Sequence, residues 1–150
     1  MSLRNVSVIG DGNVAVGSEL YEAALKAGRL IGRKGLVLVC GGLFGVMEAA
    51  CKGAKEAGGI TVGILPHYEE TANPFVDVKI PTGMGHGRNV IVAASGSVVV
   101  AVGGNYGTLS EIAFALKLGK RVIGFKTWRV EGIENYEEMG DFLSAVDRAL

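Results

Sequence analysis

Short runs of β-branched residues alternate along this chain with longer segments of helical periodicity. An uninterrupted apolar run such as Val98 to Val102 suits a strand covered on both faces, because a half-exposed strand would alternate apolar and polar residues. Repeated strand-helix-strand units predict a doubly wound α/β sheet with mostly parallel strands. The expected strands are Val6 to Gly10, Leu36 to Cys40, Ile60 to Leu65, Val76 to Ile80, Ser97 to Val102, Arg121 to Phe125 and Ile133 to Tyr136, and the expected helices are Ser18 to Ile31, Val46 to Ala57, Asn89 to Ser95, about Leu109 to Leu118 and Gly140 to Leu150.

Length and composition indicate one compact domain. The chain has 150 residues, of which 49% are hydrophobic and 20% are charged, so neither a disordered nor a fibrous protein fits. We therefore expect a single domain over residues 1–150. Fifteen basic residues balance fifteen acidic ones and no stripe of Lys and Arg is evident, so no nucleic-acid partner is expected.

The cysteines and the apolar stretches bear on where the protein resides. Cys40 ends an apolar run and Cys51 lies in a helical pattern, which is typical of reduced core residues in the cytoplasm. The apolar stretches are shorter than the roughly 20 residues that a membrane span needs, and no targeting signal is evident. No membrane association, metal site or cofactor is expected.

Three glycine-rich loops follow predicted strands: GDGNVAVG from Gly10, GGLFG from Gly41 and GGNYG from Gly103. The carboxyl ends of parallel strands meet at one edge of a sheet, where ligands bind in a crevice, so we expect the three loops to converge there. Glycines that only make tight turns between strand and helix are the alternative reading of any one loop.

The loops do not match the common nucleotide motifs. Gly10, Gly12 and Ala15 fit the dinucleotide fingerprint, but the second strand ends at Cys40 without the acidic residue that would hold a ribose hydroxyl. Neither GGLFG nor GGNYGT continues into the Gly-Lys-Ser/Thr of a P-loop. NAD and ATP are therefore disfavoured as ligands.

The GGNYGT loop is the predicted phosphate site. Adjacent glycines allow a close approach of the backbone to a ligand, and the free N–H groups of a following helix attract an anion. The residues expected to bind a phosphate or nucleotide here and in the other two loops are Gly10, Gly12, Gly41, Gly42, Gly103, Gly104, Asn105, Tyr106, Gly107 and Thr108. Thr108 and Glu111 also match a capping box, which alone could explain both residues, although the same geometry sets a carboxylate beside the anion site.

Arg88 is the second candidate for chemistry. It ends the segment TGMGHGR, in which alternate glycines let the backbone approach a ligand, and its guanidinium can hold a phosphate through two hydrogen bonds. A solvated loop arginine is the alternative. His86 and His67 are interpreted as solvated loop residues and given no role.

The helix that follows the GGNYGT loop is apolar around most of its circumference. Leu109, Ile112, Ala113, Phe114, Ala115, Leu116 and Leu118 leave almost no polar face. Such a helix is buried on nearly all sides, which predicts a subunit interface, with a homodimer as the expected assembly. Deep burial within one subunit is the competing explanation.

These motifs together resemble a known superfamily. GGNYGTLSE resembles PGGxGTxxE, the signature of the Lonely Guy (LOG) phosphoribohydrolases, long labelled "possible lysine decarboxylases"; GMGHGRN and CGGLFGVMEAACKGAKEAGG resemble two further segments of that superfamily. The likeness runs from about Val6 to Phe125. The short chain, GxGRN and the loop without proline most resemble the subgroup that includes molybdenum-cofactor carrier proteins.

The resemblance implies a Rossmann-like homodimer, or a higher homo-oligomer, that hydrolyses the N-glycosidic bond of nucleoside 5′-monophosphates. By position, Gly104, Gly107 and Thr108 would hold the phosphate, and Arg88 and Glu111 would be the catalytic pair. The decarboxylase label does not fit, because no lysine follows a recognisable pyridoxal-phosphate pattern.

Two departures from the signature keep a second function open. Gly103 stands in place of proline and Asn105 in place of a glycine, and asparagine tolerates a left-handed backbone better than most residues. The alternative to hydrolysis is a non-catalytic carrier or sensor of a phosphorylated ligand, such as a pterin cofactor or a nucleotide. A site that has lost its function is a third reading.

Overall fold

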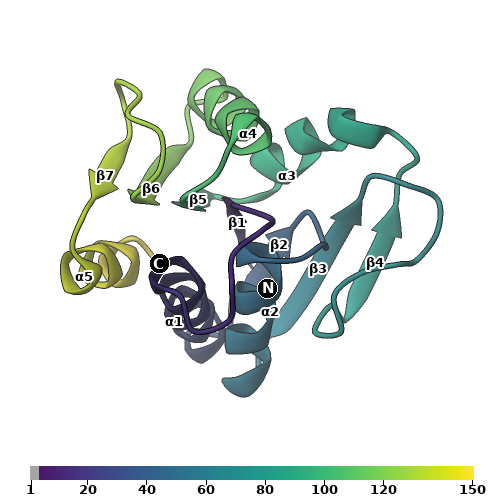
Figure 1. The fold of residues 1–150 in the computed structure, drawn as a ribbon, viewed down its shortest axis with the longest axis horizontal. Helices are drawn as coiled ribbons and strands as arrows, with labels where there is room; N and C mark the ends of the chain where they lie inside the picture. The colour runs from purple at the N-terminus through teal and green to yellow at the C-terminus, as the bar shows by residue number, and fades with distance from the viewer. Residues whose placement is uncertain (1–3) are drawn as a thin grey trace.

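The computed structural model describes residues 4–150 and shows a seven-stranded sheet in the order β4-β3-β2-β1-β5-β6-β7 (Figure 1). All six strand pairs are parallel, which confirms the predicted doubly wound α/β fold. The strands are β1 (Asn5–Gly10), β2 (Val37–Cys40), β3 (Ile60–Leu65), β4 (Val78–Pro81), β5 (Val98–Val102), β6 (Arg121–Phe125) and β7 (Glu134–Tyr136). The helices are α1 (Glu19–Arg33), α2 (Val46–Glu56), the short 3-10 helix η1 (Gly85–Arg88), α3 (Asn89–Ser95), α4 (Tyr106–Lys117) and α5 (Met139–Ala149).

The central strands β1 and β5 are covered on both faces. Val6 pairs with Val98 and Gly10 with Val102, and all five residues of β5 are buried. This double coverage explains why the run from Val98 to Val102 contains no polar residue. The edge strand β4 is exposed along its whole length, as the alternating sequence before Ile80 predicts.

Helices cover the two faces of the sheet unequally (Figure 1). α1, α2 and α5 lie on one face, and α3 and α4 lie on the other. α1 and α2 touch through their backbones: a Cβ added at Gly28 would collide with the carbonyl of Ala50, and one added at Gly53 with that of Leu25. The small residues of α2 therefore serve its packing on α1.

Helix α4 begins earlier than the sequence predicts. Its first residue is Tyr106, its N-cap is Asn105, and Leu109 donates the first intrahelical hydrogen bond to the Asn105 carbonyl at 3.0 Å. The predicted capping box at Thr108 and Glu111 is wrong, because Thr108 already lies inside the first turn. The chain reverses at Gly103 and Gly104, which have φ of +56° and +111°, so the helix can start directly after them.

The two cysteines are free and buried, as expected, with their Sγ atoms 3.5 Å apart. Cys40 ends β2 and Cys51 lies on α2. Within residues 4–150 no helix has both the length and the hydropathy needed to cross a bilayer.

The order of the strands fixes where a ligand can bind. Successive strands from β1 to β4 are added on one side, and the chain then returns to place β5 on the other side of β1. The loops after β1 and β5 therefore diverge to opposite faces of the sheet, which opens a crevice at the carboxyl ends of these strands.

Candidate functional site

A cavity of about 180 Å³ lies in this crevice. The loops after β1, β2 and β5 all contribute to its wall, together with η1 and the first turns of α2, α3 and α4. The lining residues are Val8, Ile9, Gly10, Gly12, Gly41, Met47, His86, Arg88, Asn89, Asn105, Gly107, Thr108 and Glu111. All three glycine-rich loops thus meet at one edge of the sheet.

The amino end of α4 presents free backbone donors to this cavity. The N–H groups of Tyr106, Gly107 and Thr108 precede the first intrahelical hydrogen bond, so the helix supplies no acceptor for them. The Asn105 carbonyl is held by Leu109 and by the indole Nε1 of Trp128, each at 3.0 Å. Free amides at the positive end of a helix dipole are suited to bind an anion.

Glu111 lies one turn further along α4 and lines the same cavity. Its side chain is only 8% exposed, and burial raises its pKa to about 8 even though the positive charge of Arg88 acts in the opposite direction. Among the described residues no buried side-chain oxygen lacks a hydrogen-bond partner, so the carboxyl oxygens of Glu111 must open onto the cavity. At neutral pH this group is mainly protonated and can donate a proton.

Arg88 is buried and held by the protein. Its Nε donates to the carbonyl of Ile64 at 2.9 Å, its Nη2 to the carbonyl of Gly41 at 3.5 Å, and its Nη1 to Oδ1 of Asn89. Burial lowers the pKa of the guanidinium and the Glu111 charge raises it, but arginine keeps its charge in either case. The alternative of a solvated loop arginine is therefore wrong.

Asn89 connects Arg88 to helix α4. Its Oδ1 accepts from Arg88, its Nδ2 donates to Oγ of Ser110 at 3.2 Å, and Ser110 donates in turn to the carbonyl of Gly107 at 2.6 Å. Sequence analysis assigned Asn89 no role. Its position directly after Arg88 in GRN was the available signal, but an asparagine at a helix start is usually a local cap.

An apolar cavity of about 290 Å³ adjoins the first one. It shares His86, Asn89 and Gly107 with it, and Tyr106 and Ser110 complete the wall. Tyr106 is 80% exposed, and its ring centroid lies 5.7 Å from that of Trp128. Sequence analysis left His86 out of the site, whereas the structure places it at the junction of the two cavities.

Four glycine and tyrosine positions predicted to bind the ligand do not line the first cavity. Gly42 and Gly103 are buried, the first against Leu65 and the second against Leu20, and a Cβ at Gly104 would collide with Thr108. Tyr106 faces the adjoining apolar cavity instead. These three glycines shape the turns, which is the alternative that sequence analysis left open for any one loop.

The two departures from the PGGxGTxxE signature have different structural meanings. Gly103 has a φ of +56° and donates its N–H to the carbonyl of Phe125 at 3.0 Å, and proline can do neither. Asn105 has a φ of −118°, so the tolerance of asparagine for a left-handed backbone is not used at this position. In the described residues no group of three or more His, Cys, Asp and Glu side chains is arranged to hold a metal ion.

Comparisons with known proteins agree with this geometry. The model of the SLOG cluster4 family matches residues 3–147. An uncharacterized protein of Archaeoglobus fulgidus is 50% identical over 138 residues, which cover 91% of this chain and 90% of that one. A cytokinin riboside 5′-monophosphate phosphoribohydrolase of Mycobacterium tuberculosis is 32% identical over 118 residues, which cover 71% of this chain but only 63% of the relative.

Two solved structures match the chain over nearly its full length. The molybdenum cofactor binding protein of Rippkaea orientalis is 34% identical with a TM-score of 0.88, and the match covers 99% of this chain and 98% of that one. The molybdenum cofactor carrier protein of Chlamydomonas reinhardtii is 33% identical with a TM-score of 0.86, and the match covers 98% of both chains.

Proposed function

Because the chain belongs to the SLOG cluster4 family, we propose that its crevice binds a small phosphorylated molecule and hydrolyses an N-glycosidic bond in it. The free N–H groups at the amino end of α4 receive the phosphoryl group, and the buried guanidinium of Arg88 adds a positive charge. The substrate class is a nucleoside 5′-monophosphate. The named activity of the Mycobacterium tuberculosis relative supports this class.

The position of Glu111, a nearly buried carboxyl that opens onto the cavity beside the α4 amides, is the observation that carries the catalytic part of the proposal. The carboxyl has a pKa of about 8, lies in a cavity with a phosphate-type site, and has no role in capping the helix. A buried acid with a raised pKa is a common feature of catalytic sites, and it lowers stability without benefit where the residue is purely structural.

The reaction then needs one acid and one water molecule. The bond between ribose C1′ and the base nitrogen breaks, its electron pair stays with the nitrogen, and Glu111 donates its proton to the departing base. The resulting carboxylate stabilises the positive charge on the ribosyl group and takes a proton from the water that adds to C1′. The products are the free base and ribose 5-phosphate, and Glu111 returns to its protonated form. Gly107 and Thr108 hold the phosphate throughout.

Incubation of the purified protein with AMP and with cytokinin riboside monophosphates tests hydrolysis directly. We expect free base and ribose 5-phosphate by chromatography, a rate that falls as pH rises through about 8 because Glu111 then loses its proton, and a loss of at least about a hundredfold in Glu111→Gln. Lys117→Ala is the matched control, because Lys117 is exposed at the far end of the same helix and lines neither cavity. Absence of base release, with the Mycobacterium tuberculosis enzyme active in parallel, would refute the hydrolase proposal.

A carrier of a phosphorylated pterin is the second candidate. It is favoured by the full-length match to the two molybdenum cofactor proteins, whereas the chain spans under two thirds of the Mycobacterium tuberculosis hydrolase. The apolar cavity beside the phosphate-type site, with Tyr106 and His86 in its wall, offers room for a flat ring.

The two candidates differ in whether the wild type turns its ligand over and whether Glu111 is needed for that turnover. A carrier holds its ligand mainly through the α4 amides and Arg88, so Glu111→Ala should keep the affinity for the ligand within about threefold while no turnover occurs. A hydrolase keeps its affinity in the same variant but loses turnover that the wild type has. Calorimetry with the molybdenum cofactor and with AMP, combined with product analysis, separates the two.

A further inference from the structure

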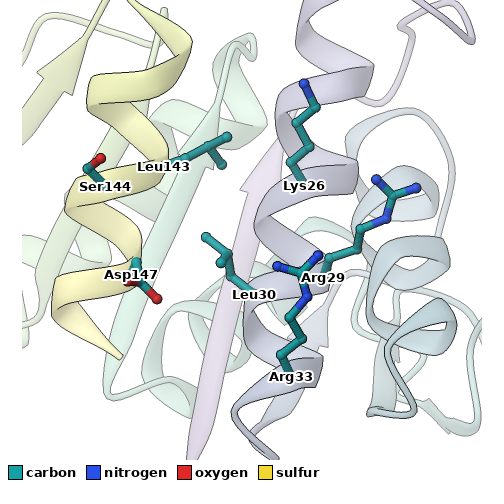
Figure 2. A pocket seen from close by; sticks show the side chains of 7 residues that line it. All are labelled: Lys26, Arg29, Leu30, Arg33, Leu143, Ser144 and Asp147. Carbon is teal, nitrogen blue, oxygen red and sulfur yellow. The ribbon is translucent and has the colours of Figure 1, made fainter.

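A further cavity in the described part of the chain has no role in the proposed function. It has a volume of about 430 Å³ and lies between α1 and α5. Lys26, Arg29, Leu30 and Arg33 line it from α1, and Leu143, Ser144 and Asp147 line it from α5 (Figure 2). We call it the α1–α5 groove.

The groove is distinct from the crevice. The groove and the crevice share no lining residue. On α1 the groove is lined by the second half of the helix, which leads directly into the start of β2. It therefore lies towards the amino ends of the strands, whereas the crevice lies at their carboxyl ends.

The groove keeps a positive charge when the ion pairs of its lining residues are taken into account. Arg29 is paired with Glu56 at 2.7 Å, and Asp147 is neutralised by Lys34 at 3.0 Å. Among residues 4–150 no carboxylate forms an ion pair with Lys26 or Arg33. These two cations are spaced seven residues apart and thus lie on one face of α1.

The wall between these cations is apolar. Leu30 points from α1 towards α5, and Leu143 points from α5 towards α1, so that the two side chains face each other across the groove (Figure 2). Both pack against the core and are only partly buried, so part of each side chain stays open to the groove.

We propose that the α1–α5 groove binds a small organic anion with an apolar body, which lies between Leu30 and Leu143 while Arg33 holds its acidic group and Lys26 adds a positive charge at the other end of the groove (Figure 2). The volume is within the range of about 300 to 1,000 Å³ that is usual for small-molecule sites. Ser144 supplies a hydroxyl for a further polar group.

Naphthalene-2-sulfonate is a suitable probe, because it combines a flat apolar body with one strong anion. Titration of the full chain, followed by the NMR signals of its backbone amides, should give saturable shifts in residues 26–33 and 143–147. Sulfate alone, which lacks the body, and naphthalene-2-methanol, which lacks the charge, should each bind at least about tenfold more weakly. The affinity should also fall with rising salt.

Variants test the two cations. Lys26→Ala combined with Arg33→Ala should weaken binding of the sulfonate at least about tenfold, and the exposed positions of both residues leave the fold intact. Arg148→Ala removes one charge from α5 outside the groove and is the matched control, with affinity unchanged.

Three results would overturn the proposal: shifts confined to other parts of the molecule, equal binding by the double variant, or equal binding of sulfate alone. A fourth is binding of oligoglutamate to the groove more tightly than the sulfonate, which would assign the groove to an acidic protein partner. The groove and the crevice share no lining residue, so shifts in residues 26–33 and 143–147 report the groove whatever happens at Gly107 and Thr108, and this test is independent of the outcome for the crevice.

Discussion

Burial of the Glu111 carboxyl costs the folded protein stability but serves the catalytic role proposed for this residue. Its carboxyl is nearly buried, and no side-chain partner compensates for the loss of hydration, so the folded state keeps it protonated up to a pKa of about 8. In the unfolded chain the same group ionises near its ordinary pKa of 4.5. The folded state thus binds a proton that the unfolded state has lost in the range between these two values.

The first prediction concerns this proton. Because the folded state holds more protons than the unfolded state, the contribution of Glu111 to the free energy of unfolding is lost as pH rises from about 4.5 to about 8. Glu111→Gln cannot ionise, so its stability relative to wild type should increase over that range by on the order of a few kcal/mol. Urea unfolding at about pH 5 and about pH 9 measures the change. Ser110→Ala should show a pH-independent difference, and the same behaviour in Glu111→Gln would contradict the account.

The second prediction concerns Asn89, which positions Arg88. Removing its side chain in Asn89→Ala frees Nη1 of Arg88 and breaks the link to Ser110, so the affinity for AMP should fall about tenfold. The exposed Asn13→Ala is the control and should bind like wild type. Calorimetry gives both values, and unchanged affinity in Asn89→Ala would show that the carbonyls of Ile64 and Gly41 hold the guanidinium without it.

At the level of secondary-structure elements, the turn between β5 and α4 decides the geometry of the candidate phosphate site. Gly103 directly follows β5 and donates its N–H to the carbonyl of Phe125 at the end of β6, and its own carbonyl accepts a hydrogen bond from the hydroxyl of Thr127 at 2.6 Å. This network depends on a positive φ and on a free N–H. This turn therefore requires glycine at position 103, where the signature has proline.

The third prediction follows from that turn. Gly103→Pro, which would restore the signature in sequence, should destabilise the protein by about 3 kcal/mol or more, because proline cannot reach a φ of +56° and lacks the N–H. Gly119→Ala is a control with a φ of +74° and open space around it, and should cost only about 1 kcal/mol. Thermal unfolding compares the two. A Gly103→Pro protein as stable as wild type would mean that the turn can adopt the backbone of the signature.

At the level of the whole molecule, α4 leaves an apolar face uncovered. Ala113, Phe114 and Leu118 are exposed, and the exposed fractions of Phe114 and Leu118 are 42% and 50%. The alternative explanation, that this face is apolar because it is buried within one subunit, is therefore wrong. The expectation of a homodimer through this face remains a prediction. The face begins next to the apolar cavity at Tyr106, so a partner subunit there would lie close to the candidate site.

The fourth prediction tests this assembly. We expect the wild type to be a dimer in sedimentation experiments, and Phe114→Glu combined with Leu118→Glu to be a monomer, because two charges would be buried without partners. Val16→Glu changes a more exposed apolar residue in the loop before α1 and should leave the dimer intact. A wild type that sediments as a monomer would refute the interface.

The order and type of the elements could be predicted because they depend on residues close in sequence. The strands Ile60–Leu65 and Arg121–Phe125 and the helix Asn89–Ser95 have the predicted ends, since their periodicity and their flanking glycines act locally. The start of α4 could not be predicted in this way, because the hydrogen bond from Trp128 to the Asn105 carbonyl joins segments 23 residues apart. The roles of Asn89 and His86 were missed for the same reason: each acquires a site only through η1 packing beside α4.

The amino-acid sequence was sufficient to specify a parallel sheet, glycine turns at the carboxyl ends of its strands and a helix that starts after the third of these turns, because these follow from hydrophobic periodicity and from the backbone freedom of glycine. Tertiary structure decided which side chains share a cavity and what charge they carry. The protonated state of Glu111, the fixed orientation of Arg88 and the groove between α1 and α5 all arise from burial by residues distant in the chain. Desolvation depends on three-dimensional neighbours, and no local pattern of residues records it.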